Sequence, residues 1–318
     1  MKKSKIILFM LVFCAVSAHA EASELESAIA VAKANCSGIS AELQKMQTIA
    51  GVNTAVTGVG TLAGAGAVAT GFVKQSKDRA AGELEQKLNQ LKNAETGGEK
   101  YEALICSEDF TKRLEAYVKE QAEKSDGYLS EKNKLDEQSK KLGNARTGLM
   151  AGNTATNIAG AAIAGTNKVS ENLAGRIGAC KAAAGNVRTK WNHARQEEGA
   201  DKGMLARADK IASACDKFNL EQVGKINSRA TGAMWSGIAG AGIGAAGTIT
   251  SATANSDSVR GDKTADGADK AIKINTASNI MAIGAVGASL AGTIFNATQI
   301  KAVNDALKAA KECEEELK

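Results

Sequence analysis

Cysteine is the residue type best able to do chemistry in this chain of 318 residues. Beyond the first twenty residues the sequence keeps five cysteines, and none belongs to a CxxC pair: Cys36, Cys106, Cys180, Cys215 and Cys313. Zinc ribbons and thioredoxin-like redox centres use closely spaced cysteine pairs, so this spacing favours neither. Widely separated cysteines in an exported chain are typical of disulfides. Because five is odd, at least one thiol stays free or bonds to another chain.

Other residues that support catalysis are scarce. His193 is the one histidine beyond residue 20, so a single chain cannot build a histidine-based triad or a two-histidine metal site. The GxG pattern at Gly58 and Gly60 follows no predicted strand, and no GxxxxGK[ST] motif occurs. We therefore predict no enzymatic activity, no metal and no cofactor. Since 40 basic residues nearly balance 35 acidic ones, we also predict no nucleic-acid partner.

Residues 1–20, MKKSKIILFMLVFCAVSAHA, have the three parts of a bacterial Sec signal peptide. Lysines 2, 3 and 5 form a positive start, an apolar run follows over residues 6–16, and Ala18-His19-Ala20 is a small-x-small cleavage site. We predict cleavage after Ala20. The mature chain is then expected in the periplasm, at the cell envelope or secreted, where disulfides persist.

The remaining sequence predicts an all-α protein. It has no proline and few aromatic residues, and no period-2 apolar alternation marks a strand. Four segments carry no charged residue, and charged sequence flanks each of them: 47–73, 147–167, 230–256 and 274–300. We call these the charge-free segments.

Short sequence motifs recur among the charge-free segments. The second contains NTATNI at 153–158 and the fourth NTASNI at 275–280, which indicates a duplicated two-helix unit; chance similarity between alanine- and glycine-rich tracts is the alternative. We predict an elongated antiparallel bundle of two duplicated helical hairpins. Its parts are the signal peptide 1–20, the first half of hairpin 1 at 21–73, a charged helical insertion at 74–146, the second half of hairpin 1 at 147–197, and hairpin 2 at 198–318.

Glycines inside the charge-free segments predict close helix packing. A stripe spaced by alternate three and four residues starts at Leu25 and continues into the first segment, where its residues become small: Ala50, Asn53, Thr57, Gly60, Gly64, Ala67 and Gly71. A second stripe with the same spacing enters the third segment through Val223, Ile226, Ala230 and Ala233. Each glycine costs a helix ~1 kcal/mol relative to alanine, and closer backbone approach, as in a glycine zipper, offsets that cost. The predicted packing positions are Gly60, Gly64, Gly71, Gly152, Gly160, Gly237, Gly240, Gly244, Gly247, Gly284, Ala288 and Gly292. The stripe is predicted at Gly152, Ala155, Ala159 and Ala162 in the second segment, and at Ala277, Met281, Gly284, Ala288 and Ala291 in the fourth.

The four cysteines other than Cys106 lie at similar distances along the chain from the middles of the charge-free segments. In antiparallel hairpins they would therefore lie near one level of the bundle. We predict the disulfides Cys36–Cys180 and Cys215–Cys313. The pairing of Cys180 with Cys215 and of Cys36 with Cys313 remains open.

Two functions fit these observations. Segments of 21 to 27 uncharged residues are long enough to cross a bilayer, and small-xxx-small patterns are typical of membrane helix contacts. The first prediction is an exported, non-enzymatic envelope protein whose glycine-rich hairpins mediate membrane association or oligomerisation, with lipid, a second copy or an envelope protein as partner. The alternative is a soluble periplasmic adaptor that binds a protein partner through residues 74–146.

Overall fold

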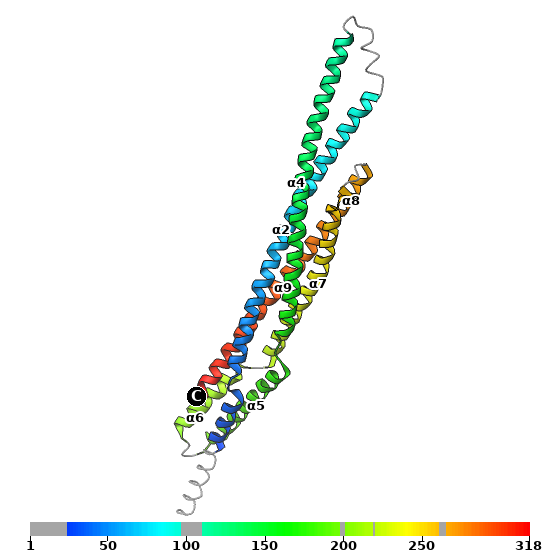
Figure 1. Ribbon diagram of the computed structural model, residues 1–318. Coiled ribbons are helices and arrows are strands. Elements are labelled where there is room, and N and C mark those ends of the chain that lie inside the picture. The colour runs from blue at the N-terminus through cyan, green and yellow to red at the C-terminus, as the bar shows by residue number, and fades with distance from the viewer. Residues whose placement is uncertain (1–23, 97–109, 198–200, 219, 261–264) are drawn as a thin grey trace, which may run out of the picture. The chain divides into compact units, whose positions relative to one another are not determined.

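The computed structural model describes residues 24–96, 110–197, 201–218, 220–260 and 265–318 (Figure 1). Within these ranges the chain is helical and contains no strand, which confirms the prediction of an all-α bundle of long helices. The predicted signal peptide and Cys106 lie outside the described residues.

A first helical stretch covers residues 24–36 and precedes the labelled helices. Those are α2 (Ile39–Thr96), α4 (Phe110–Thr166), α5 (Glu171–Ala194), α6 (Lys202–Asp216), α7 (Leu220–Asn255), the single turn α8 (Asp257–Arg260) and α9 (Ala265–Glu316). Because the chain has no proline, α2, α4, α7 and α9 run through their glycines without a break.

Local side chains and one special glycine set the helix boundaries. Gly38 has a φ of +76° and turns the chain between residue 36 and the start of α2. Ser170 begins α5 by accepting a hydrogen bond from the Leu173 amide at 3.1 Å. Asp201 begins α6 in the same way, accepting from the Gly203 amide at 2.8 Å.

The chain divides into two compact units. The first contains residues 1–56, 159–236 and 291–318, and the second contains residues 57–158 and 237–290. Helices α2, α4, α7 and α9 each contribute residues to both units. The described residues of each unit form a bundle.

The first unit has a conventional apolar core. Its largest buried apolar side chains come from residues 24–36, from α2, α5, α6, α7 and α9, and from the residue two positions after α6: Leu25, Ile39, Leu43, Ile177, Val187, Ile211, Phe218, Ile226 and Val303. The C-terminal turns of α9 cap the start of α2, because the Glu314 carboxylate accepts hydrogen bonds from the Ser40 amide at 2.9 Å and the Ser40 hydroxyl at 2.7 Å. Helix α5 packs against α6.

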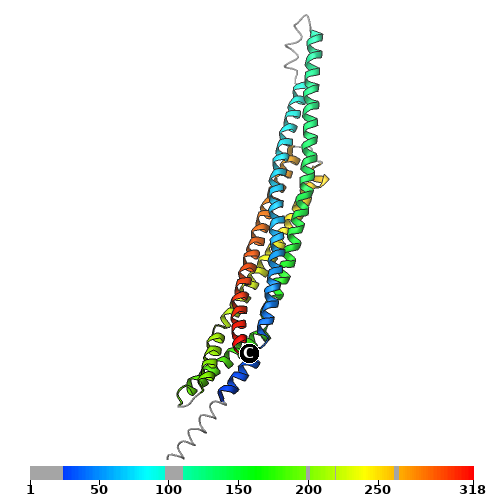
Figure 2. The same ribbon diagram turned by 90° about the vertical axis from the view of Figure 1, so that its left-hand side faces the viewer.

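The second unit is a four-helix bundle with antiparallel neighbours. Its part of α2 lies beside its part of α4 in both views (Figures 1 and 2). Residue numbers increase along α2 while those of the contacting residues on α4 decrease, so the two helices are antiparallel. The pairs are Gly60 beside Thr156, Gly71 beside Arg146, Asp78 bonded to Ser139, and Glu85 bonded to Lys132. The charged residues 74–96 and 110–146 therefore continue α2 and α4.

Candidate functional site

The most unusual feature of the second unit is its polar interior. Asn157 donates from Nδ2 to Asn153 Oδ1 at 3.1 Å and to Ser289 Oγ at 2.8 Å. Ser289 Oγ also lies 2.9 Å from Asn153 Oδ1 and 3.0 Å from Asn157 Oδ1. All three side chains are at most 2% exposed. Two helices, α4 and α9, are thus joined through amide and hydroxyl groups where a soluble bundle would place leucine.

The first unit continues this pattern in its share of the charge-free segments. Asn53 Nδ2 on α2 donates to Asn296 Oδ1 on α9 at 2.8 Å. Gln299 Nε2 donates to the Asn167 carbonyl at 2.8 Å, and Asn167 Nδ2 donates to the Met46 carbonyl at 3.2 Å. These buried bonds join α2, α9 and the C-terminal end of α4. Asparagine is therefore the recurring cross-helix donor in both units.

The outer surface of the same segments is apolar. Among the described residues, all but four of the exposed large apolar side chains lie in charge-free segments; the four are Val31, Val118, Leu129 and Leu220. Those in the segments are Ile49, Val52, Val59, Leu62, Phe72, Val73, Ile158, Trp235, Ile238, Ile243, Ile249, Ile280, Ile283, Leu290 and Ile294. The charge-free segments therefore bury asparagine, serine and threonine together with glycine and alanine, and expose most of their large apolar side chains, the reverse of an ordinary soluble helix.

Two helical stretches, Glu24–Asn93 and Asp269–Glu316, are long and apolar enough to cross a membrane by length and composition. The core helix of a soluble protein meets the same criterion. Such a core helix is mostly buried, however, whereas only 28% of the most apolar window of each stretch is buried inside this protein.

Six of the predicted packing glycines lie where a side chain would collide with a neighbouring helix. A Cβ atom would come closer than 3.0 Å to a side-chain atom at Gly60, Gly64, Gly71, Gly240, Gly244 and Gly247. Most of the atoms met belong to asparagine or threonine, such as Asn157 beside Gly240 and Thr154 beside Gly244. These glycines therefore make room for the polar interior as well as for the neighbouring backbones.

The other predicted packing positions differ among themselves. Gly160, Gly237 and Gly292 are buried, Ala288 is half-buried, and Gly152 and Gly284 are exposed. Along α4 and α9 the small-residue stripe is not the buried one. The buried stripe runs through Met150, Asn153, Asn157 and Ala164 on α4, and through Ser278, Ala282, Ala285 and Ser289 on α9. The prediction followed the small apolar residues of α4 and α9 and therefore chose a face that is not the buried one, because asparagine and serine occupy many of the buried positions.

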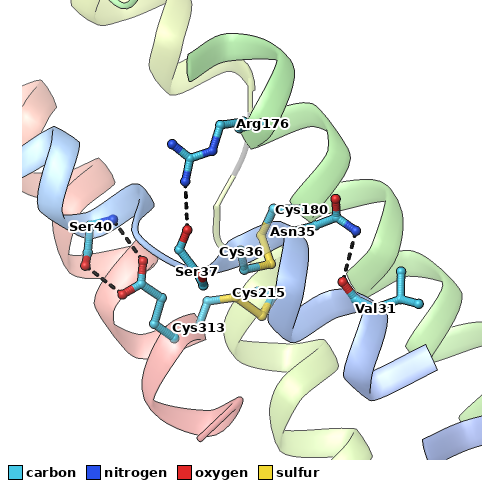
Figure 3. Close-up of a disulfide and its surroundings, with 10 residues drawn as sticks. Val31, Asn35, Cys36, Ser37, Ser40, Arg176, Cys180, Cys215 and Cys313 are labelled. Carbon is cyan, nitrogen blue, oxygen red and sulfur yellow. Dashed lines mark hydrogen bonds between the residues drawn. A yellow bond between two sulfur atoms is a disulfide. The ribbon is translucent and has the colours of Figure 1, made fainter. Parts of the chain in front are cut away.

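Two disulfides lie next to one another in the first unit (Figure 3). Cys36 is bonded to Cys180 and Cys215 to Cys313, which is the first of the two pairings that the spacing left open. The Sγ atoms of Cys36, Cys215 and Cys313 all lie within 4.8 Å of one another, and all four cysteines are 1% exposed. Because these sulfurs are bonded in pairs, no thiolate among them is available to a metal. The bonds join residues 24–36 to α5, and α6 to α9.

A charged layer lies next to the charge-free residues of the second unit. Lys74 is 2% exposed and donates to Asp78 Oδ2 at 2.7 Å. Asp78 also accepts from Ser139 Oγ and, at 2.7 Å, from Asn275 Nδ2. Arg146 is fully buried, and burial lowers the pKa of its guanidinium to about 10, so it stays charged at neutral pH.

His193 is exposed near the end of α5, one turn from Lys190, which pairs with Glu24 at 2.6 Å. Neighbouring Trp191 lies under the guanidinium of Arg195, with 4.7 Å between Cζ and the ring centroid. These contacts stabilise the surface of the first unit.

The feature of the interior that sequence reasoning missed is the set of buried asparagines on α4 and α9. The repeated NTATNI and NTASNI contain it, since Asn153, Asn157, Asn275 and Asn279 are the asparagines of those motifs and all are buried. Their spacing of four places both members of each pair on one helix face. Comparisons of this chain with protein-family models, with curated proteins and with solved structures find no match.

Proposed function

We propose that this chain is an exported, non-enzymatic protein of the bacterial cell envelope, and that its charge-free segments associate with a membrane as a polar-cored helical bundle. The observation that carries the proposal is the reversed distribution of side chains in these segments. Exposed Leu62 (75%) and Ile249 (69%) are on the outside, while Asn157 and Ser289 (1% each) are inside.

The physical argument is a comparison of solvents. In water, exposed apolar surface is unfavourable by ~25 cal/mol per Å², and monomeric soluble proteins rarely expose large contiguous apolar patches. In lipid, the same surface is matched to its surroundings. Polar side chains must then find partners inside the bundle, as Asn53 does with Asn296 and Asn157 with Ser289.

The length and ends of the segments agree with this function. Each charge-free segment has at least the ~20 residues that cross a hydrocarbon core. Trp235 is 61% exposed and follows Arg229 by six residues, which is where an interfacial anchor would lie. Close contacts at Gly240 and Gly244 are those of a glycine-zipper-like interface, which we assign to helix packing within the membrane.

Liposome flotation at high salt, without detergent, tests the proposal. High salt removes purely electrostatic attachment to lipid headgroups. We expect the purified mature protein to float with both neutral and anionic vesicles. The variant Leu62→Lys/Ile158→Lys should stay at the bottom of the gradient, because each charge near a bilayer centre costs about 3 kcal/mol on insertion scales.

The matched control is Val118→Lys/Leu129→Lys. Val118 (51%) and Leu129 (47%) are similarly exposed but lie in the charged part of α4, so this variant should float like the parent protein. Equal flotation of all three proteins would contradict membrane contact through the charge-free segments. A parent protein that stays at the bottom as a monodisperse particle would favour the soluble adaptor instead, and one that stays there as an oligomer would assign the apolar faces to a second copy.

A further inference from the structure

Within its described residues, the second unit contains a buried positive charge that has no hydrogen-bonding partner. Arg146 is 0% exposed, and its Nε, Nη1 and Nη2 atoms are buried with no hydrogen-bond acceptor among the residues that the structure describes. A guanidinium group offers five N–H donors. Removing a charge from water costs several kcal/mol unless an opposite charge or several hydrogen bonds replace the lost hydration.

The carboxylate of this layer is engaged elsewhere. Asp78 accepts hydrogen bonds from Lys74, Ser139 and Asn275. Arg146 lies against Gly71, seven residues before Asp78 on α2, which corresponds to two helical turns or ~10 Å along the axis. With Lys74 matched to Asp78, the charge of Arg146 is the excess.

The groups around Arg146 also have unused hydrogen-bonding capacity. A Cβ on Gly71 would lie 3.0 Å from Arg146 Cζ and 2.2 Å from Asn279 Oδ1, so the guanidinium and this amide meet over the glycine. Asn279 Oδ1 is buried without a donor in the described chain. On α7, Asn255 lies against Gly143, one turn before Arg146, and neither of its two amide atoms has a partner there.

We propose that Arg146, together with the Asn255 amide, binds a small inorganic anion inside the second unit. The anion supplies the missing negative charge and accepts from the guanidinium donors, while Asn255 Nδ2 adds a neutral donor. This site is independent of the membrane proposal, because it depends only on the interior of the folded bundle.

Thermal unfolding of the purified full chain tests the site. The midpoint Tm is measured in sodium chloride, sodium phosphate and sodium gluconate at constant ionic strength, with gluconate as the bulky reference anion. We expect Tm to rise in a saturable way with chloride or phosphate, by roughly 4 °C at an anion concentration 100-fold above Kd. Whichever of the two anions acts identifies the occupant.

Arg146→Met should remove the difference between the anions and raise Tm in gluconate, because the uncompensated charge is gone. The control is Arg176→Met: Arg176 is 36% exposed and already bonded to Glu42 and the Ser37 carbonyl, so this variant should keep the anion effect. An anion effect that persists in Arg146→Met would overturn the assignment.

A second measurement uses the parent protein alone and does not depend on how the variant folds. Line broadening of the ³⁵Cl NMR signal reports chloride in exchange with the protein, and added phosphate should narrow the line if it takes the same site. Equal Tm values in all three salts, with neither chloride broadening nor phosphate binding by calorimetry, would mean that water alone solvates Arg146, and the proposal would be wrong.

Discussion

Asn157 on α4 donates to the Ser289 hydroxyl on α9 across 2.8 Å, and both side chains are 1% exposed. The two residues are 132 positions apart along the chain and lie in different charge-free segments. A cross-helix bond of this kind fixes the rotation of each helix, because amide and hydroxyl donors are directional whereas small apolar residues are interchangeable.

Ser289→Ala should therefore destabilise the protein. The substitution leaves Asn153 Oδ1 and Asn157 Nδ2 with a partner fewer in a buried site, which costs about 1–3 kcal/mol. Chemical unfolding measures the loss. Thr298→Ala on the same helix is the control, since the Thr298 hydroxyl bonds to the carbonyls of its own helix at Ile294 and Phe295. An equal loss in both variants would contradict a special role for the asparagine–serine network.

Two glycines of the first charge-free segment should respond to alanine with opposite signs. A Cβ at Gly60 would lie 2.2 Å from Thr156 Oγ1 and 3.1 Å from Thr156 Cβ, whereas no atom lies within 4 Å of one at Gly58. Gly58→Ala should stabilise by up to ~1 kcal/mol, because alanine is the better helix former. Gly60→Ala should destabilise despite the same propensity gain. Unfolding midpoints of the pair measure the difference, and equal stabilisation would show that the helices are not closely packed there.

Among the described glycines, Gly38 should be the one whose backbone conformation makes it most sensitive to substitution. Its φ of +76° lies in the left-handed region, so Gly38→Ala is expected to cost about 1 kcal/mol or more, while Gly38→Asn should cost less. The position is spatially open, with Arg176 Nη2 the nearest atom at 3.5 Å from a Cβ. Thermal unfolding of both variants tests this, and a harmless alanine would indicate that the turn adopts another conformation in solution.

Each of the two disulfides should contribute to stability. Cys36→Ser/Cys180→Ser and Cys215→Ser/Cys313→Ser should each lower stability by ~2–5 kcal/mol, because each bond closes a long loop. Peptide mapping of the non-reduced protein should recover both pairs. Thiol titration of the denatured mature chain should then find one reactive group, Cys106. A Cys36–Cys313 peptide would instead support the other pairing.

The stripes on α2 and α7 could be predicted from the sequence, and those on α4 and α9 could not. Along α2 the predicted positions Ala50, Asn53, Thr57, Gly60, Gly64, Ala67 and Gly71 are all buried. The stripe there continues from apolar residues that define its phase, starting at Leu25. On α4 and α9 asparagine and serine mark the buried face, whereas hydropathy predicts that these residues lie on the outer face. Composition alone does not show which face of a helix is interior when it is not known whether water or lipid surrounds the bundle.

Local helix propensity also fails to show that α4 is continuous through its charged part. Ser125-Asp126-Gly127 reads as a break, yet α4 passes through it without interruption, and no atom lies within 4 Å of a Cβ at Gly127. The ion pair between Lys132 and Glu85 at 2.8 Å, five residues further on, joins α4 to α2. This tertiary contact helps to offset a glycine that costs ~1 kcal/mol locally.

The disulfides also decide how the chain would respond to a pulling force on its two ends. Tension entering near residue 24 would reach Cys36, pass through sulfur to Cys180, follow the backbone to Cys215, and leave through Cys313. All four charge-free segments lie inside the two closed loops, off this path. Between the outer cysteines only the stretch from Cys180 to Cys215 could lengthen, by at most roughly 120 Å. The helices with the polar interior would be mechanically shielded until a disulfide is reduced.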